Sequence, residues 1–450
     1  MTKGRLKAGV CEIDLKPEPG MMTGDGAPMA KGSKTPIMAR ALVFDNGQTS
    51  MAIATLDIMG IAREDTWRAG QLAHERCGIP ADAVLTVCSH THVAPSTLPT
   101  LHQYAGHFNR YFGEEMVAKE VAWRERVVQG IAEAVATAHA NRQDASVGVI
   151  TTELPWLVFN RRRHTRNFGV WTHWMGIPKD QAYLPEGPID PEFQLLVLRD
   201  TGHKPMAMLW SFTGHNSFNF GDQYSADIAH TVQEALDGRI GAHIPTLYTP
   251  GCSGNTNYHD FNKPYGLEKA TDEVASAIVA IYREACTVPE VELGCRKFQL
   301  DLAQRDTGRY WWKHDIATKM PSWSEYGQKE VDRFEAERRE QETYNTDVTV
   351  MRIGKTGIVG MPAESFVEFG LEIKSRSPFR NTIVCSYAND YAGYVATRRA
   401  FIGGSYEVWP TLNARVGREG GYLIADKAVE LLNGLAGVPA RSRSVSHENW

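Results

Sequence analysis

Ala83-Val84-Leu85-Thr86-Val87-Cys88-Ser89-His90-Thr91-His92 is an apolar, β-branched run that ends in two histidines separated by one residue. The run predicts a buried strand. Side chains alternate between the two faces of a strand, so His90 and His92 should project to the same side, about 6 to 7 Å apart. Two neighbouring imidazoles can bind one metal ion or divide the work of catalysis, and they can equally hydrogen-bond in a loop without a chemical role. Further ligand candidates are needed to choose between these interpretations.

The length and composition are those of an ordinary globular protein. The chain has 450 residues, of which 42% are hydrophobic and 22% charged, which is enough for one large core or two domains. A formal net charge of −5 provides no general attraction to nucleic acid or to an anionic membrane surface. The charge alone identifies no partner class, and a local charged patch could still exist. For the chain as a whole we expect a small-molecule substrate and no nucleic-acid partner, with a homo-oligomer left open.

The sequence shows neither a signal peptide nor a membrane span. The first ten residues lack the apolar segment of a signal peptide, and no window approaches 18 consecutive apolar residues. The seven cysteines are widely spread and include no CxxC pair, so we expect reduced thiols and no disulfide framework. These observations predict a cytoplasmic protein.

The apolar periodicity changes repeatedly between strand-like and helix-like patterns. This alternation predicts an α/β fold of mixed β-sheets surrounded by helices. Strands are expected at 39–44, 50–57, 83–88, 147–152, 193–199, 206–211, 245–248, 348–353, 356–360 and 382–387. Helices are expected at 65–78, 120–141, 225–238, 267–285 and 420–435.

No internal repeat or Pro/Ser-rich linker divides the chain. We therefore predict a single large catalytic domain over residues 1–437, followed by a loosely ordered tail at 438–450. The charged segment 322–343 has no apolar stripe wide enough for a core helix, so it is expected as an exposed helix or a surface excursion.

Two further segments offer metal-ligand candidates. A second apolar strand, MAMLWSFTGHN at 206–216, ends in His215. Glu364 follows the strand at 356–360 and is expected in the first turn of a helix. An acid at that position could simply be favoured by the helix dipole, or it could reach a metal.

Two more segments carry groups suited to substrate contact. The stretch 386–397, SYANDYAGYVAT, contains three tyrosines and predicts a tight loop whose phenols pack together or face a cleft. Arg161 lies in a basic run at 158–164 with several tryptophans nearby. Such a run is either a solvated face or a binding site for an anionic or carbonyl oxygen.

Taken in order, these motifs resemble the catalytic domain of the neutral, non-lysosomal ceramidases and their bacterial relatives, which are zinc-dependent amidohydrolases. AGVCEIDLKP at 8–17 is similar to the family's AGxxxxDITP start, and SHTH at 89–92 stands where the family has ATHTHSGP. Five later motifs follow in the family's order: Asn160-Arg161, Asp190-Pro191-Glu192, Thr213-Gly214-His215-Asn216-Ser217, Ser225-Ala226-Asp227 and Met361-Pro362-Ala363-Glu364. The segment from Tyr387 to Tyr406 resembles the family's N-x-Y-x-x-Y-V-x-T stretch, and the whole resemblance covers about residues 8 to 435.

The resemblance implies a zinc site made of four residues that are far apart in the sequence: His90, His215, Glu364 and Tyr394. It also implies that three residues contact the substrate beside the metal: His92, Arg161 and Tyr406. Imidazole and carboxylate are normal zinc ligands, whereas a phenolate needs the charge of the cation to lower its pKa. The implied reaction is attack of an activated water on an amide carbonyl, with Arg161 or Tyr406 stabilising the oxyanion and His92 protonating the leaving amine.

Departures from the family bear on the substrate. The family's GDxSPN-like motif corresponds best to Gly254-Asn255-Thr256-Asn257, so no serine nucleophile is supported there, and Ser253 resembles a GxSxG serine only superficially. Ceramidases are usually secreted or membrane-associated and carry a further β-sandwich domain, whereas the resemblance here covers the catalytic domain and the sequence shows no export signal. We therefore do not expect a long-chain lipid substrate. The basic and aromatic stretch 160–174, together with Trp311, Trp312 and His314, suggests a pocket for a smaller, polar or anionic substrate, or else an oligomer interface.

Three functions remain open at this point. The leading one is a zinc-dependent hydrolase that cleaves the carbon–nitrogen bond of an N-acyl or other small amide. The second is a zinc-dependent esterase or lactonase that uses the same residues, because an activated water attacks esters and amides alike. The third, a non-catalytic binding protein with the same fold, is disfavoured because every implied ligand position carries a competent side chain.

Overall fold

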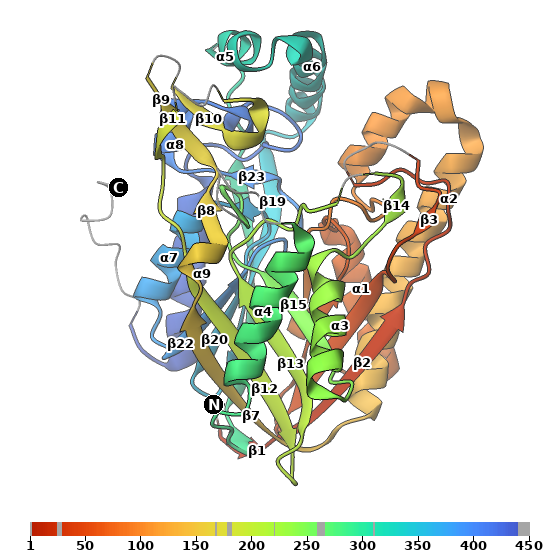
Figure 1. The fold of residues 1–450 in the computed structure, drawn as a ribbon, viewed down its shortest axis with the longest axis vertical. Coiled ribbons are helices and arrows are strands. Elements are labelled where there is room, and N and C mark those ends of the chain that lie inside the picture. Colours follow the sequence, from red (N-terminus) through yellow and green to blue (C-terminus); the bar gives the residue numbers. More distant parts are fainter. Residues whose placement is uncertain are drawn as a thin grey trace.

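An eight-stranded mixed sheet forms the larger part of the fold (Figure 1). In spatial order its strands are β15 (Thr246–Pro250), β13 (Pro205–Phe212), β12 (Glu192–Asp200), β7 (Gln143–Glu153), β2 (Lys7–Asp14), β4 (Met38–Asp45), β5 (Ser50–Leu56) and β6 (Val84–Cys88). The pairs β5/β6 and β13/β15 are parallel, and the other neighbours are antiparallel. Strand β15, at one edge, lies near β5 and β6 at the opposite edge, so the sheet curls and brings its two edges together.

A second sheet of four strands packs against the first. Its strands, in order, are β18 (Leu293–Ala303), β19 (Thr343–Ile353), β20 (Thr356–Gly360) and β22 (Asn381–Cys385), of which only the pair β20/β22 is parallel. Buried side chains from this sheet, including Met351, Ile358 and Ile383, belong to the same apolar core as β4, β5 and β6. The two sheets are therefore held together by burial of apolar surface between them.

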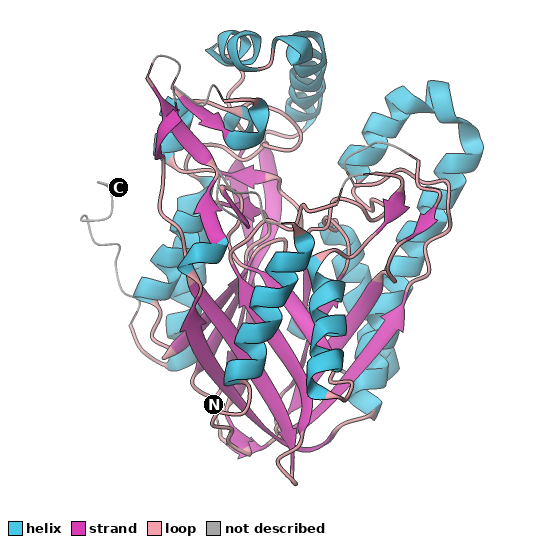
Figure 2. Cartoon of the chain, in the orientation of Figure 1, coloured by secondary structure: helices cyan, strands magenta, loops and turns pink. Residues whose placement is uncertain are grey.

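Amphipathic helices cover the outer faces of the sheets (Figure 2). Helices α1 (Arg63–Cys77) and α2 (Pro99–Ala140) pack in the core of β2 and β4, and α3 (Ile228–Ile240) and α4 (Leu267–Ile281) share a core with β12, β13 and β15. Helices α7 (Val367–Arg376) and α9 (Gly420–Ala436) cover the four-stranded sheet. The expected α/β fold of mixed sheets surrounded by helices is confirmed. Helix α2 begins 21 residues before the expected start at residue 120, because only its second half carries the apolar stripe that indicated a helix.

Short elements gather beyond one end of the two large sheets. They include the three-stranded sheet β10-β9-β11, made of β10 (Val170–Thr172), β9 (Arg162–Thr165) and β11 (Ala182–Pro185), and the helices α5 (Trp311–Lys319), α6 (Ser324–Glu340) and α8 (Arg398–Gly403) (Figure 1). The segment 322–343, expected as an exposed helix or a surface excursion, contains α6, most of whose described side chains are exposed or half-buried. Val331 and Phe334 on α6 are fully buried, and Val331 packs in a cluster with Trp312 and Trp409. Two apolar residues three positions apart are enough to attach this otherwise polar helix.

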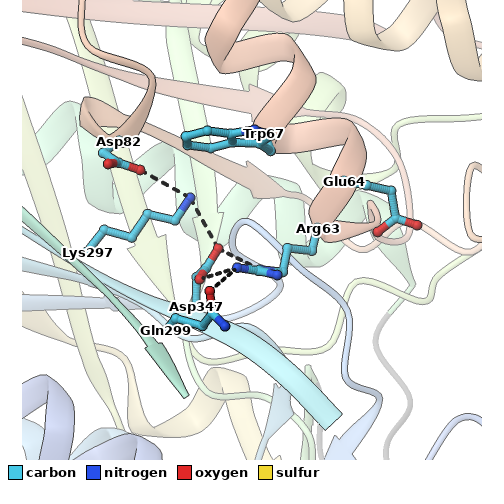
Figure 3. A pocket seen from close by; sticks show the side chains of 7 residues that line it. All are labelled: Arg63, Glu64, Trp67, Asp82, Lys297, Gln299 and Asp347. Atoms are coloured by element: carbon cyan, nitrogen blue, oxygen red, sulfur yellow. Dashed lines mark hydrogen bonds and ion pairs between the residues drawn. The ribbon is translucent and has the colours of Figure 1, made fainter. Parts of the chain in front are cut away.

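A cavity of about 470 Å³ lies where α1 meets the four-stranded sheet (Figure 3). Arg63 of α1 donates two hydrogen bonds to the carboxylate of Asp347 on β19, at 2.8 and 3.0 Å. Lys297 of β18 lies 3.2 Å from the same carboxylate and 5.1 Å from the centre of the Trp67 ring. These ion pairs across the cavity connect α1 to the four-stranded sheet, and they leave the charges paired with one another. None of the residues that line the cavity belongs to the site described below.

The structure, a computed structural model, describes residues 2–24, 29–166, 169–177, 182–219, 221–258, 266–308 and 311–439. Most of the tail expected at 438–450 lies outside these ranges, so that prediction stays untested. Among the described residues, no helix has both the length and the apolar character that crossing a membrane requires.

Candidate functional site

The candidate site is assembled by loops that follow the carboxyl ends of parallel strands. His90 lies two residues beyond β6, His215 three residues beyond β13, and Glu364 four residues beyond β20. Each of these strands has a parallel partner, in the pairs β5/β6, β13/β15 and β20/β22. Parallel strands of one sheet have their carboxyl ends on the same side, and α/β folds place ligands beyond these ends. Here the carboxyl ends come from both large sheets. This topology brings together residues separated by more than 270 positions in the chain.

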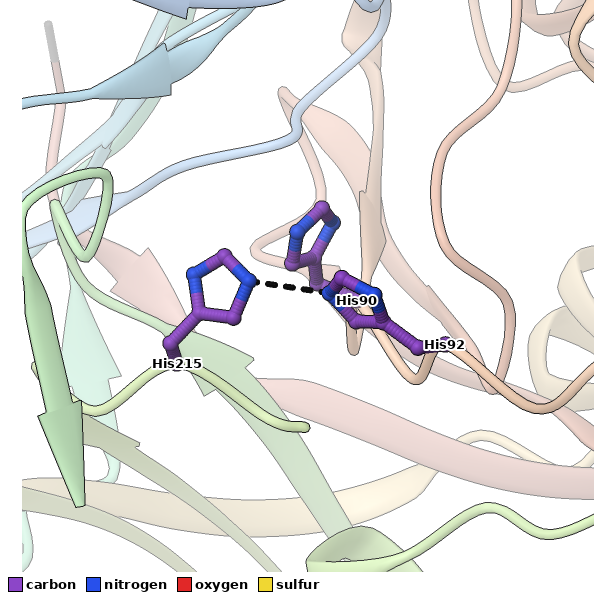
Figure 4. A group of neighbouring side chains, drawn as sticks. All are labelled: His90, His92 and His215. Atoms are coloured by element: carbon purple, nitrogen blue, oxygen red, sulfur yellow. Dashed lines mark hydrogen bonds between the residues drawn. The ribbon is translucent and has the colours of Figure 1, made fainter. Parts of the chain in front are cut away.

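His90, His92 and His215 form a compact cluster (Figure 4). One ligand atom from each imidazole lies within 4.8 Å of the others, so the three histidines could hold a metal ion. The Nε2 atoms of His92 and His215 are 2.9 Å apart, and the ring centres of His90 and His215 are 4.5 Å apart. His90 and His215 are buried, whereas His92 is half-buried.

The two histidines of the HTH motif do not lie on a strand, so that expectation is wrong. Strand β6 ends at Cys88, and His90 has a left-handed backbone with φ of 61°. Backbone hydrogen bonds from Ser89 to the carbonyl of Leu56 and from His90 to the carbonyl of Ile58 turn the chain away from the sheet. The rings of His90 and His92 therefore lie edge to face with their centres 4.9 Å apart.

Backbone carbonyls fix the protonation of two of these imidazoles. The Nδ1 atom of His90 lies 2.7 Å from the carbonyl oxygen of Met59, and the Nδ1 atom of His215 lies 3.3 Å from that of Ser253. A carbonyl oxygen only accepts, so each Nδ1 carries a proton and each Nε2 presents a lone pair. Burial lowers the pKa of both His90 and His215, which keeps both rings in the neutral form that binds metals.

Glu364 lies in a short strand and not, as expected, in the first turn of a helix. Strand β21 (Glu364–Ser365) pairs in parallel with β23 (Tyr394–Val395), and α7 begins only at Val367. Burial alone would raise the pKa of Glu364, but the hydroxyl of Tyr391 and the guanidinium of Arg161 help to hold that pKa below its ordinary value. The carboxylate is therefore ionised, and Tyr391 donates a hydrogen bond to its Oε1 atom.

The facing atoms of His90 and Glu364 have the chemistry of a cation site. His90 Nε2 and Glu364 Oε2 are 3.3 Å apart, both are buried, and neither makes a hydrogen bond within the described part of the chain. A buried lone pair and a buried carboxylate oxygen without hydrogen bonds are costly unless a further group satisfies them. A divalent cation bound by imidazole and carboxylate fits this requirement.

Arg161, Tyr394 and Tyr406 form a second network beside the histidines. Arg161 Nη2 donates to the hydroxyls of Tyr394 at 3.1 Å and Tyr406 at 2.7 Å, and these two hydroxyls are 2.9 Å apart. The same guanidinium donates to the carbonyl of Gly254 at 2.7 Å. Burial raises the pKa of both tyrosines, so both phenols are protonated here. The basic run at 158–164 is thus no solvated face at Arg161, which is buried.

Four charged residues hold the turn that carries Tyr406, and only Arg162 among them belongs to a segment considered in the sequence. The 3-10 turn η5 (Tyr406–Val408) includes the buried Glu407, whose carboxylate accepts a hydrogen bond of 2.6 Å from Arg162. Arg305 donates to the carbonyls of Glu407 and Trp409, and Asp315 of α5 accepts from the backbone amide of Ser405 at 2.8 Å. The burial of Arg162 could not be predicted from the basic run at 158–164, because such runs usually face solvent.

Two neutral residues that the sequence analysis named only as members of motifs position the histidines. Tyr387 stacks on His90 with ring centres 3.8 Å apart, and its hydroxyl lies 3.0 Å from Ser253 Oγ. Asn216 donates to the carbonyl of Ser89 at 3.1 Å, which ties the loop of His215 to the loop of His90. Ser253 is fully buried in this network, in line with a supporting role. The tyrosine-rich motif and the position of Asn216 next to His215 were the only signals in the sequence.

Comparisons with known proteins place the fold. No family model and no curated protein sequence matches the chain significantly. Its fold matches the crystal structure of a neutral ceramidase from Pseudomonas aeruginosa with a TM-score of 0.67 at 17% sequence identity, over 98% of this chain and 76% of that one. It also matches a ceramidase complexed with C2, with a TM-score of 0.68 at 17% identity, over 98% of this chain and 77% of that one. The resemblance to neutral ceramidases that the motifs indicated is therefore confirmed at the level of the fold.

Proposed function

We propose that this protein is a zinc-dependent hydrolase that cleaves the carbon–nitrogen bond of an N-acyl or other small amide through an activated water. The observation that carries the proposal is the facing pair of His90 Nε2 and Glu364 Oε2, buried without hydrogen bonds beside the other two histidines. The fold supports it, because the two similar structures are both named ceramidases, enzymes that act on an amide.

The donor set suits zinc. His90, His215 and Glu364 offer two neutral imidazoles and one carboxylate, which are ordinary zinc ligands, and Tyr394 is the proposed fourth ligand. A zinc ion bound there would act as a Lewis acid toward a carbonyl and lower the pKa of a coordinated water. Strand pairing supports Tyr394 in this role, because its Cα lies directly opposite that of Glu364 in the β21/β23 ladder.

The neighbouring residues supply the rest of the chemistry. Arg161 and the Tyr406 hydroxyl, 2.7 Å apart, are donors that can stabilise negative charge on the carbonyl oxygen. Their position is fixed before substrate binds, because Arg161 is also held by the carbonyl of Gly254. His92 is half-buried and can deliver a proton to the leaving amine. Its contact with His215 also makes it close enough to be a ligand, and the experiment below separates the two roles.

Metal content and hydrolysis, measured on the same preparations, test the proposal. We expect about one zinc per chain in the purified protein, and loss of both zinc and amidase activity in His90→Ala. His92→Ala should keep the zinc and lose activity if it transfers a proton, and should lose both if it is a ligand. The matched control is His203→Asn, which alters an exposed histidine in the turn between β12 and β13 and should change neither.

Two outcomes decide against the proposal. A His90→Ala protein that is free of zinc and fully active would refute it. Hydrolysis of an ester or lactone without hydrolysis of the matched amide would replace it by the esterase alternative, since the amide additionally requires a proton donor for its leaving nitrogen. The cytoplasmic location and the homo-oligomer stay predictions.

A further inference from the structure

Two exposed tryptophans lie next to Tyr406. Trp174, in the turn η3 (His173–Met175), packs edge-on against the ring of Tyr406 with centres 5.0 Å apart. Trp323, in the turn η4 (Pro321–Trp323), lies 6.3 Å from Trp174 at an angle of 53° between the ring planes. Their exposed fractions are 44% and 41%. We call Trp174 and Trp323 the aromatic pair.

The aromatic pair is attached to the elements that build the site. The backbone amide of His173 donates to the carbonyl of Arg161 at 2.9 Å, so the turn that carries Trp174 is tied to the residue that binds Tyr394 and Tyr406. Trp323 follows α5, and Asp315 of that helix accepts hydrogen bonds from the backbone of Ser405 and from the indole of Trp409. Both indoles are therefore held in place relative to the Tyr406 turn.

Exposed indoles at such a position are suited to contact a ligand. Leaving a large aromatic side chain in water costs free energy, and its flat face favours stacking with another ring. Aromatic pairs also attract cations, but Glu407 in the Tyr406 turn is already paired with Arg162 at 2.6 Å and lies 3.8 Å from Arg161, so its carboxylate offers no free charge to a cationic ligand. An uncharged planar ring satisfies both conditions.

We propose that the aromatic pair binds an uncharged planar ring carried by the substrate, so that the preferred substrates are amides bearing an aromatic group. This inference rests on the proposed amidase function and assigns its substrate class. It replaces the polar or anionic substrate suggested by the basic run, because the arginines of that run that lie at the site, Arg161 and Arg162, are buried and paired with protein groups.

Steady-state kinetics on matched amides test the inference. The ring-bearing probes are phenylacetamide and N-benzylacetamide, which carry the ring on opposite sides of the amide, and the ringless probes are acetamide and hexanamide. Trp174→Ala and Trp323→Ala should raise KM for at least one ring-bearing probe about ten-fold or more beyond any change in KM that the same variant shows for acetamide. The matched control is Trp156→Ala, because Trp156 is 55% exposed but lies in the turn η2 (Pro155–Leu157) and donates to Glu273.

A binding measurement separates this inference from the proposed function. Phenylacetate, which has no bond to hydrolyse, should bind in a titration followed by ligand-observed NMR, and its affinity should fall in Trp174→Ala but not in Trp156→Ala. If no amide is hydrolysed and this pattern still holds, the amidase fails while the ring site stands. If amides are hydrolysed and both tryptophan variants match the parent protein, the ring site is overturned. An equal loss for hexanamide, or a change of oligomeric state without a change in KM, also overturns it.

Discussion

Replacing Arg162 by methionine should lower the melting temperature of this protein by several degrees. The Arg162 side chain is fully buried and contacts two buried carboxylates, those of Glu186 and Glu407, with side-chain exposures of 4% and 0%. It also donates to the carbonyl of Gly404 at 2.8 Å. Methionine fills a similar volume without charge, so both carboxylates lose their main counterion inside the protein.

The size of the effect follows from this burial. Removing one partner of a buried ion pair costs about 3 to 5 kcal/mol, because the remaining charge is left without compensation. At roughly 2.1 cal/mol/K per residue, a chain of 450 residues has an unfolding entropy of about 0.9 kcal/mol/K. The expected fall in melting temperature is therefore about 3 to 5 °C. Adding Glu407→Gln should restore part of this loss, because the double variant contains one uncompensated charge fewer.

Differential scanning calorimetry of the single and double variants measures both effects. The control is Arg68→Met, which removes an exposed ion pair with Glu125 and should change the melting temperature by less than about 1 °C. An Arg162→Met protein as stable as the control would show that the buried charges are compensated by other groups. A double variant less stable than the single one would show that Glu407 stabilises the fold independently of Arg162. Either result refutes the reasoning.

Three other perturbations probe different parts of the fold. Hydrogen bonds to Asp237 and Glu12 raise the pKa of His243 above its ordinary value. The stability gained from protonated His243 is therefore complete below about pH 6.5 and is lost as the pH rises through the higher pKa of the folded state. In a pH series of melting temperatures, His243→Gln should lack this decline, and a slope equal to that of the parent protein would contradict the prediction. Gly254→Ala should reduce kcat about ten-fold or more, because the added Cβ would lie 2.4 Å from the carbonyl oxygen of Glu364, and wild-type kinetics would show that the loop can move without harm. Returning zinc at 100 times its dissociation constant to chelator-treated protein should stabilise it by about 2.7 kcal/mol, or roughly 3 °C at this chain length, and the absence of any shift would exclude a metal site in the folded state.

The buried strands were the part of the fold best predicted from sequence. Strands such as β4, β5, β13 and β20 are continuous apolar runs, and a strand buried on both faces leaves that mark in the sequence. Strand β2 was missed because KAGVCEID mixes charged and apolar residues, and β18 because most of its residues are at least partly exposed. Short strands such as β8 (Val158–Asn160) and β21 have too few residues to show any periodicity.

The candidate site was predicted as a set of residues and not as a geometry. Motif order pointed to His90, His215 and Glu364, and the structure brings them together at the strand ends. Their orientation depends on backbone hydrogen bonds between distant loops, such as the contact from His90 Nδ1 to Met59, which no local pattern encodes. For the same reason, the stacking of Tyr387 on His90 had no sequence signal beyond a surplus of tyrosines.

The distribution of backbone strain favours catalysis over a purely structural role for this site. Among the described residues, seven other than glycine have positive φ, and three of them are His90, Tyr387 stacked on it, and Ser405 beside Tyr406. Such conformations cost of order 1 to 3 kcal/mol each and persist where the surrounding structure enforces them. A protein that used this fold only as a scaffold would gain stability by relaxing these loops. Here the strain coincides with the buried His90–Glu364 contact, where a fixed ligand geometry would serve the proposed metal-assisted hydrolysis.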